Sequence, residues 1–282
     1  IESKSFFKDV CERFVKNKRA MIALVIFLII ALMAIFGPMI SPYSYDGMDT
    51  AIMNQRPSTA HWFGTDRFGR DLFTRVLYGA RISLMVGIVT AVINTIIGVI
   101  YGGIAGYVGG RVDMWMMRLT DILYSIPELL YIILIMLIFG SNVRSIIIGV
   151  CVAGWISMAR MVRSQIITLK EQEFALAAFV LGANSRRILF KHLIVNSLGT
   201  IIVTVTLMIP QAIFMEAFLS FVGVGISAPM ASLGTLAQDA RTYLEIFPYQ
   251  MLFPVAAICV TIFSLNFIGE GLNSALNPKG KR

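Results

Sequence analysis

The sequence has few charged residues and contains long stretches without any. Charged side chains make up 14% of the 282 residues, against about 25% in an average soluble domain, and hydrophobic residues make up 57%. The mean hydropathy is +0.78. Six segments are apolar enough to cross a bilayer core, which takes about 20 helical residues. They are 20–40, 82–107, 119–139, 146–162, 198–222 and 250–269. The composition excludes an ordinary soluble domain and predicts an all-α polytopic membrane protein with six transmembrane helices.

Residues that commonly support catalysis or metal binding are also scarce. The two histidines, His61 and His192, fall on opposite sides of the membrane in the expected topology, and the three cysteines lie far apart. The sequence contains no Gly-x-Ser-x-Gly turn and no cysteine pair with metal-ligand spacing. We therefore expect no metal, no bound cofactor and no disulfide framework, and the pattern disfavours an intramembrane enzyme.

A phosphate-binding loop is missing as well. No Gly-x-x-x-x-Gly-Lys-Ser/Thr occurs, so no loop of this chain can cradle nucleotide phosphates beside a lysine. A glycine-rich run at the end of the second span has no lysine, and close helix packing explains it better. It comprises Gly98, Gly102, Gly103, Gly106, Gly109 and Gly110. Any nucleotide that drives this protein must be bound by another polypeptide.

The basic residues predict how the chain is oriented. The net charge is +8, and the Lys and Arg residues lie beside the expected spans rather than in a stripe with aromatics. This placement favours contact with anionic lipid over nucleic acid. Alternating spans put the N-terminal segment, the 170–191 region and the 279–282 tail on one side, which holds most of the positive charge. The positive-inside rule then predicts that both termini are cytoplasmic.

One polar interruption, residues 173–192, stands out between two apolar runs. It predicts a helix, a turn at Gly182 with positive φ, and a second helix capped by Ser185. The first helix has an apolar face at helical spacing, made by Phe174, Ala177, Ala178 and Leu181. A short, alanine-rich amphipathic helix at a membrane surface suits docking into a groove of another protein. An ordinary helix lying on the lipid surface is the alternative.

Three stretches resemble a known family. The residues from Trp155 through Glu173 and Gly182 to His192 resemble the EAA loop region of ABC importer permeases. Gly64-Thr-Asp-Arg-Phe-Gly-Arg-Asp71 resembles the segment before the second span in the C-type permease subunit of the oligopeptide, dipeptide and nickel uptake group. Gly269-Glu-Gly-Leu-Asn-Ser-Ala-Leu-Asn-Pro278 resembles the C-terminal signature of that group. With the flanking matches, the resemblance covers nearly the whole chain.

The resemblance implies a type I ABC importer permease fold in the cytoplasmic membrane, with cytoplasmic EAA coupling helices. Residues 1–81 would form an N-terminal cytoplasmic segment, the first transmembrane helix and an external segment. Residues 82–282 would form the core permease domain, with five transmembrane helices and the EAA loop near 169–196. The implied partners are a homologous second permease subunit, two cytoplasmic ATPase subunits that bind ATP and Mg, and an extracytoplasmic substrate-binding protein.

The resemblance also assigns a role to the polar interruption. In the family, this helix sits in a cleft of the ATPase and moves as ATP closes the ATPase dimer. Glu173 would be a polar contact or a local cap, the two alanines the close-packed face, and Gly182 the turn that fixes the second helix. The implied coupling residues are Glu173, Phe174, Ala177, Ala178, Leu181, Gly182 and Arg187.

Candidates for the substrate pathway come from the ionisable and flexible residues within the spans. An intramembrane charge is costly and normally faces protein or water. Glu216 can line the pathway or bind a peptide amine, and an interhelical hydrogen bond to the partner subunit is an equal alternative. Glu128 follows Pro127, whose missing amide can kink the helix. Met208 and Met215 can line an adaptable path, although methionine also serves as core filler.

The function expected from these features is peptide import as the permease half of an ATP-driven ABC importer. A nickel or metallophore importer is the alternative within the same group. From another class, an ATP-independent secondary transporter would be expected to show inverted repeats and coupling-ion carboxylates. A channel would need a filter sequence, and none is evident. The chain itself is expected not to be an enzyme, because separate subunits hydrolyse the ATP.

Overall fold

The computed structural model describes residues 6–276 of the chain. Within this range all extended regular structure is helical, and a single isolated bridge joins Thr65 and Asp71. The α-helices are α1 (Phe6–Lys16), α2 (Lys18–Ile40), α3 (Leu72–Val108), α4 (Gly110–Tyr124), α5 (Glu128–Phe139), α6 (Val143–Ala153), α7 (Trp155–Lys170), α8 (Glu173–Val180), α9 (Ser185–Arg187), α10 (Ile194–Val222), α11 (Leu233–Arg241) and α12 (Tyr249–Leu276). A 3-10 turn, η1 (Thr50–Ile52), and a π-helical segment, η2 (Ile188–Leu193), complete the chain.

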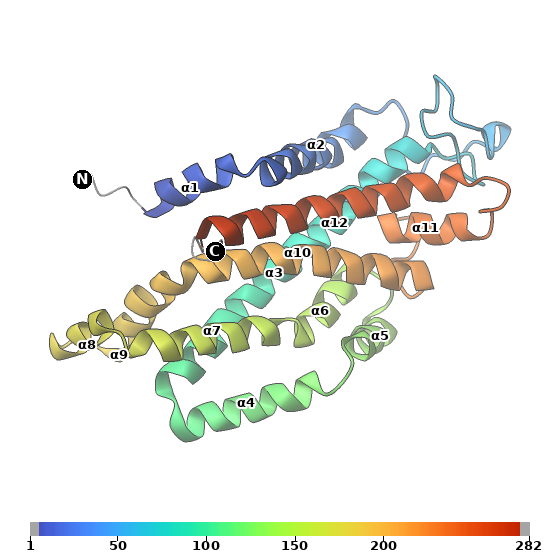
Figure 1. Cartoon of the computed structure of the whole chain (residues 1–282). Helices are drawn as coiled ribbons and strands as arrows, with labels where there is room; N and C mark the ends of the chain where they lie inside the picture. The colour runs from blue at the N-terminus through green and yellow to red at the C-terminus, as the bar shows by residue number, and fades with distance from the viewer. Residues whose placement is uncertain (1–5, 277–282) are drawn as a thin grey trace.

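The long helices form a bundle whose two ends differ. In Figure 1, α2, α3, α10 and α12 run alongside one another, and α7 continues the bundle toward α8. The short helices α8 and α9 lie at the same end as α1. The segment between α2 and α3 and the helix α11 lie at the opposite end. The bundle therefore has two distinct ends, the α8 end, which carries α8 and α9, and the capped end, which carries α11.

The predicted transmembrane helices are confirmed in number, with a correction to their continuity. Five helical stretches of the described chain are long and apolar enough to span a membrane, and there are six if a bent pair of helices crosses as one span. The bent pair is α4 and α5, which meet at 74°. The interval 119–139 was expected as one span, but it breaks because Pro127 has no N–H to continue the hydrogen-bond ladder. The hydroxyl of Tyr131 donates to the carbonyl of Leu123 across the break, at 3.1 Å.

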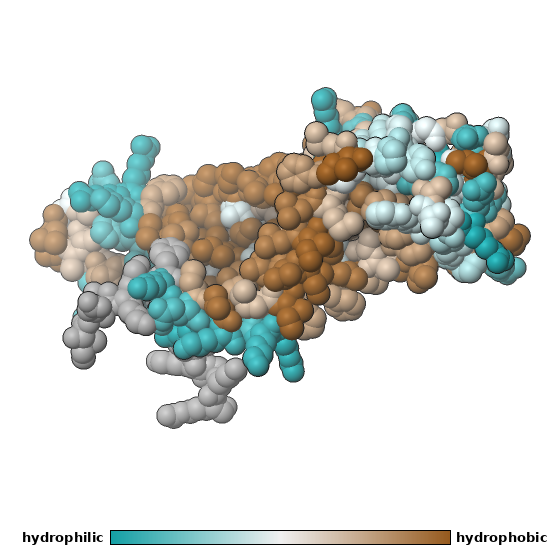
Figure 2. Space-filling view, turned by 90° about the horizontal axis from the view of Figure 1, so that it is seen from above, coloured by the Kyte–Doolittle hydropathy of each residue, from teal (hydrophilic) through white to brown (hydrophobic). Residues whose placement is uncertain are grey.

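The surface follows the same division. Figure 2 shows apolar residues over the middle of the molecule and hydrophilic residues gathered toward both ends. On α2, side chains such as Ile29, Leu32 and Phe36 remain exposed. A monomeric soluble protein rarely exposes so continuous an apolar surface, whereas lipid tails cover one without cost. The described residues thus form a multi-pass membrane protein.

The glycine run packs α3 against α7, as the sequence predicts. A Cβ added to Gly98 would lie 2.6 Å from Cβ of Met158, and one added to Gly102 would lie 2.9 Å from Cα of Ala159. Gly106 lies equally close to the carbonyl of Arg163, at 2.8 Å from its own added Cβ. The four-residue spacing places all three on one face of α3. Small residues in this row let the two backbones approach each other closely.

The capped end is held by polar contacts between distant parts of the chain. Tyr249 Oη donates to the carbonyl of Gln55 at 2.9 Å, and Gln250 Nε2 donates to Asn54 Oδ1 at 2.9 Å. These bonds tie the start of α12 to the segment that follows α2. The division of the chain between residues 81 and 82 falls inside α3, and it stays a prediction about sequence regions. The residues 277–282, which include the basic tail and the end of the C-terminal signature, lie outside the described range.

Candidate functional site

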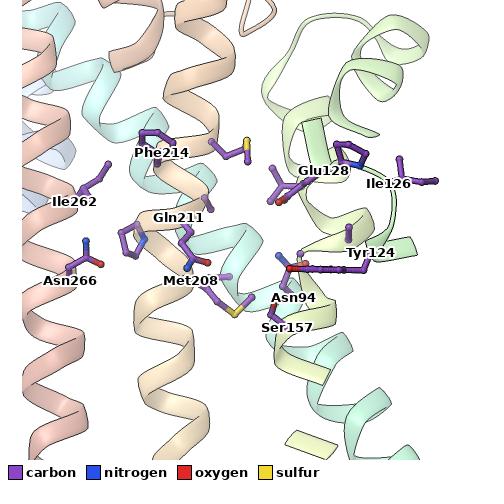
Figure 3. A pocket seen from close by; sticks show the side chains of 18 residues that line it. Asn94, Tyr124, Ile126, Glu128, Ser157, Met208, Gln211, Phe214, Ile262 and Asn266 are labelled. Carbon is purple, nitrogen blue, oxygen red and sulfur yellow. The ribbon is translucent and has the colours of Figure 1, made fainter. Parts of the chain in front are cut away.

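A cavity of about 660 Å³ opens in the apolar zone between α10 and the α4–α5 break. Its walls come from α3, α4, α5, α6, α7, α10 and α12. Figure 3 shows Met208, Gln211 and Phe214 on one side and Tyr124 and Glu128 on the other. A cavity of this size matches sites that take small organic ligands, which measure about 300–1,000 Å³. This cavity is the candidate path for a solute.

The α10 wall is set by helical geometry. Met208, Gln211 and Met215 recur at spacings of three and four residues, so they share one face of α10. The prediction that Met208 and Met215 can line a path therefore agrees with their positions, although no observation tests their contact with a substrate. Thioether side chains adapt to varied partners because their torsions are flexible. This wall suits a ligand whose side chains vary.

Glu216 is not among the residues that line this cavity, and its assignment to the substrate pathway stays a prediction. The residue follows Met215 on α10 and so points about 100° away around the helix, into the protein. It is fully buried, and its carboxylate accepts hydrogen bonds from Ser83 Oγ at 2.7 Å and from Ser220 Oγ at 2.9 Å. Ser220 Oγ in turn accepts from Ser232, which caps α11, at 3.4 Å. The alternative expected for Glu216 was a hydrogen bond to the partner subunit, whereas the observed bonds join helices of this same chain.

The wall opposite α10 carries polar groups that the sequence reasoning passed over or left unassigned. Glu128 begins α5 directly after Pro127, and the break turns this end of α5 toward the cavity. Asn94 lies on α3, and Ser157 lies on α7, at the same side of the cavity (Figure 3). Asn94 could be found only by knowing which face of α3 is covered by α7. Nothing in the sequence marks a lone asparagine in a span as lining a cavity.

The helix–turn–helix predicted at the polar interruption is present at the opposite end of α7. The helix α8 ends at Val180, and Gly182 has φ = +83°. The Gly182 N–H donates to the Phe179 carbonyl, and the Ala183 N–H donates to the Ala178 carbonyl, both at 3.0 Å. These two bonds make a Schellman motif, in which glycine is favoured because its backbone enters the left-handed region without strain. An added Cβ at Gly182 meets nothing within 4 Å, so backbone conformation alone selects glycine here.

The apolar face of α8 is rotated relative to the prediction. Ala175 and Ala178 are buried in one cluster with Ile166 of α7 and Leu189 of η2. Ala178 therefore packs inside this chain, and the surface left for a partner is formed by other residues. That surface is apolar and exposed and comprises Phe174, Leu176, Ala177, Phe179, Val180 and Leu181. The periodicity located the helix but could not tell which stripe the chain itself covers.

Two capping assignments also change. Asn184 caps the second helix, since its Oδ1 accepts from the Arg187 N–H at 2.8 Å, so the cap lies one residue before the predicted Ser185. Glu173 is exposed in the first turn of α8, where the described structure has no side-chain capping bond. It is therefore not a local cap, and the polar contact expected of it stays a prediction. A carboxylate at this position is favoured by the helix dipole. Arg187 is exposed beside the turn.

Comparison with known proteins identifies the family of the chain. Residues 98–282 match the family described as binding-protein-dependent transport system inner membrane component. Residues 5–57 match the N-terminal transmembrane domain of oligopeptide transport permease C. The chain belongs to this family of inner membrane transport components. The resemblance drawn from the EAA loop region is thereby confirmed.

Full-length relatives agree with this assignment of the permease. The oligopeptide transport system permease protein OppC of Bacillus subtilis (strain 168) is 49% identical over 99% of this chain and 91% of its own length. The dipeptide transport system permease protein DppC of the same organism is 47% identical over 99% of this chain and 88% of its own length. OppC of Escherichia coli (strain K12) is 45% identical over 100% of this chain and 94% of its own length.

Proposed function

We propose that this permease forms half of the translocation pathway of an ATP-driven importer of peptides. The cargo class rests on the names of the relatives, which are oligopeptide and dipeptide transport permeases. The cavity supports the same conclusion, because it combines a flexible apolar wall on α10 with a polar wall on α3 and α5. A peptide needs polar partners for its backbone inside a membrane, where each unsatisfied group costs several kcal/mol.

The exposed apolar tip of α8 is the observation that carries the coupling role. Phe179, Val180 and Leu181 are 70%, 82% and 86% exposed, and they lie at the α8 end of the bundle. An apolar tip fixed by a rigid turn is suited to insertion in a cleft of a separate ATPase subunit. Two such ATPase subunits, which would bind ATP and Mg, would provide the energy, and this chain is expected to bind no cofactor itself.

The remaining partners follow from the two ends and from the open cavity. Phe214 lines the cavity and is nevertheless 58% exposed, so a homologous second permease subunit would complete the wall. An extracytoplasmic substrate-binding protein would dock at the capped end, where α11 lies. The α8 end also carries the basic residues around α1, including Lys16, Lys18 and Arg19, which supports a cytoplasmic location for the termini.

A nickel or metallophore cargo is the alternative within the group. Residues 6–276 contain no group of three or more His, Cys, Asp or Glu side chains that could hold a metal ion. The preference for a peptide cargo rests on the names of the relatives, which are oligopeptide and dipeptide transport permeases. Uptake of labelled dipeptides and of a nickel complex by the reconstituted importer compares the two cargoes directly.

The coupling role is tested with Leu181→Ser in the assembled importer. Burial of a leucine side chain contributes about 1.5–3 kcal/mol, so losing it from the interface is expected to weaken ATPase binding by roughly 10–150-fold. Val15→Ser is the matched control, since Val15 is an exposed apolar residue on α1, 60% accessible. ATPase co-purification and peptide-stimulated ATP hydrolysis are measured. If Leu181→Ser co-purifies with the ATPase and hydrolyses ATP as the wild type does, the tip of α8 is not part of the coupling interface.

The orientation needs a separate experiment. A cysteine placed at Asn184, in a background with Cys11, Cys151 and Cys259 replaced by serine, is treated with a membrane-impermeant thiol reagent. Labelling is expected only after the membrane is opened, because Asn184 is exposed at the proposed cytoplasmic end. Labelling of intact cells would show that Asn184 is external and would contradict the proposed topology.

A further inference from the structure

We propose that Glu128 and Asn94 form a subsite for the positively charged amino terminus of a peptide, within the cavity beside α10. The inference rests on the proposed function and deepens it, because it names the part of the cargo that this wall would recognise. The two residues come from different helices, α5 and α3, and both line the cavity. Figure 3 shows both on the wall that faces Met208 and Gln211.

Glu128 is the one carboxylate among the residues that line the cavity. Within residues 6–276 its side chain makes no hydrogen bond and no salt bridge, although its backbone opens α5. In contrast, Asp113 is paired with Arg163, and the buried Glu216 accepts hydrogen bonds from two serines. An intramembrane carboxylate without a partner is costly unless a cation or water meets it. An ionised carboxylate at this position is the group that attracts an ammonium ion.

Asn94 supplies the second, independent observation. The residue is 3% exposed, and its Oδ1 has no hydrogen-bond partner in the described part of the chain. Buried amide oxygens are almost always paired, so this unpaired one at the cavity wall is available to accept a hydrogen bond from a ligand. An oxygen acceptor is also what an ammonium group requires, since it carries three N–H donors and no acceptor. Asn94 therefore complements the carboxylate of Glu128.

The rest of the cavity narrows the class of ligand. A single carboxylate and an amide suit a monovalent ammonium group better than a divalent metal ion, which prefers several oxygen ligands. The opposite wall of Met208, Phe214 and Met215 is apolar and adaptable, which suits the side chains next to the amino terminus. Every peptide with a free amino terminus carries the same ammonium group, so the subsite would bind peptides irrespective of their sequence.

The test measures binding in the cavity directly. The reconstituted importer is incubated, without binding protein, with a tripeptide that bears a benzophenone side chain at its second residue. The peptide is used with a free amino terminus and with an N-acetylated one, and labelling of this chain by light is compared. In the wild type, the free-amine peptide is expected to label about tenfold more strongly at equal concentration, as a charge-assisted bond implies. In Glu128→Gln the ratio is expected to fall to about one, and in Asn94→Leu it is expected to fall less far.

Gln211→Leu is the matched control, because Gln211 is a polar residue on the opposite wall that carries no charge. Its free-amine preference is expected to stay at the wild-type value. A wild-type ratio near one, no labelling of this chain, an unchanged ratio in Glu128→Gln, or an equal loss in Gln211→Leu would each overturn the subsite. Peptide uptake by the same wild-type preparation is measured in parallel. Uptake without amino-terminal preference refutes the subsite alone, whereas absence of uptake refutes the proposed function.

Discussion

Replacing Gly102 by alanine is expected to force α3 and α7 apart. The added Cβ would overlap the carbonyl oxygen of Ala159 and would lie 2.9 Å from its Cα. These are backbone atoms, so no side chain can rotate away to make room, and one of the two helices must shift. Gly103 provides a matched comparison, because its added Cβ would lie 3.5 Å from Leu189 Cδ1, which is ordinary contact.

The expected size of the effect follows from two opposing terms. Alanine is favoured over glycine inside a helix by about 1 kcal/mol, and both positions receive this gain. Overpacking against a fixed neighbour costs about 1–3 kcal/mol, and only Gly102 incurs this cost. The two variants should therefore differ in stability by about 1–3 kcal/mol, with Gly103→Ala at or above the wild type. At roughly 2–4 °C per kcal/mol, the melting temperatures should differ by several degrees.

Thermal unfolding of the purified protein in detergent measures this difference. Trp155 begins α7 and lies close to the contact, so its fluorescence reports the separation of the helices. Gly102→Val should lower the melting temperature further than Gly102→Ala, because the side chain is larger. If Gly102→Ala unfolds at the same temperature as Gly103→Ala, the close approach of α3 and α7 is not what the glycines provide.

Three further predictions concern buried or capping groups. Glu216→Leu should lower the free energy of unfolding by about 1–3 kcal/mol for each serine left unpaired, whereas Glu216→Gln should retain most of the stability. Equal losses for the two variants in thermal unfolding would contradict the hydrogen-bonded role of Glu216. Asp113→Asn should cost about 1.5–3 kcal/mol, because this carboxylate is only 14% exposed against Arg163, and Asp121→Asn, at 58% exposed, should cost less than about 1 kcal/mol. If Asp121→Asn lowered the melting temperature more than Asp113→Asn, the ion pair between Asp113 and Arg163 would not be the main contact that holds α4. Asn184→Ala should cost about 1 kcal/mol and Ser185→Ala almost nothing, and protection of the Arg187 amide from hydrogen exchange distinguishes them.

The number of spans was predictable because hydrophobicity is a local property of the sequence. The helix bounds were less so, since helices continue beyond the apolar run into polar residues that still pair their backbones. The helix of the second span begins at Leu72 rather than at residue 82, because Asp71 caps it there. The break at Pro127 was foreseeable from the missing amide, but its angle depends on how α4 and α5 pack.

The site was predictable only in part, because the sequence does not determine how each helix is rotated about its own axis. Sequence spacing places Met215 and Glu216 on adjacent faces of α10, but it does not say which face meets the cavity and which meets Ser83. The same ambiguity affected α8, where Ala178 turned out to face the protein interior. Gly182 escaped it, because positive φ is a property of one residue and its immediate hydrogen bonds.

The continuity from α9 through η2 to the end of α10 has a mechanical consequence. The stretch Ser185–Val222 contains 38 residues in one uninterrupted helical path, which corresponds to about 57 Å at 1.5 Å per residue. A tilt of about 5° at the α8 end would displace the far end by about 5 Å, which is roughly the width of one peptide chain. The Schellman turn at Gly182 and the Asn184 cap join α8 to the near end of this rod without a flexible linker. A small movement of the eight-residue helix α8 can therefore be transmitted by this continuous helix across the full thickness of the membrane.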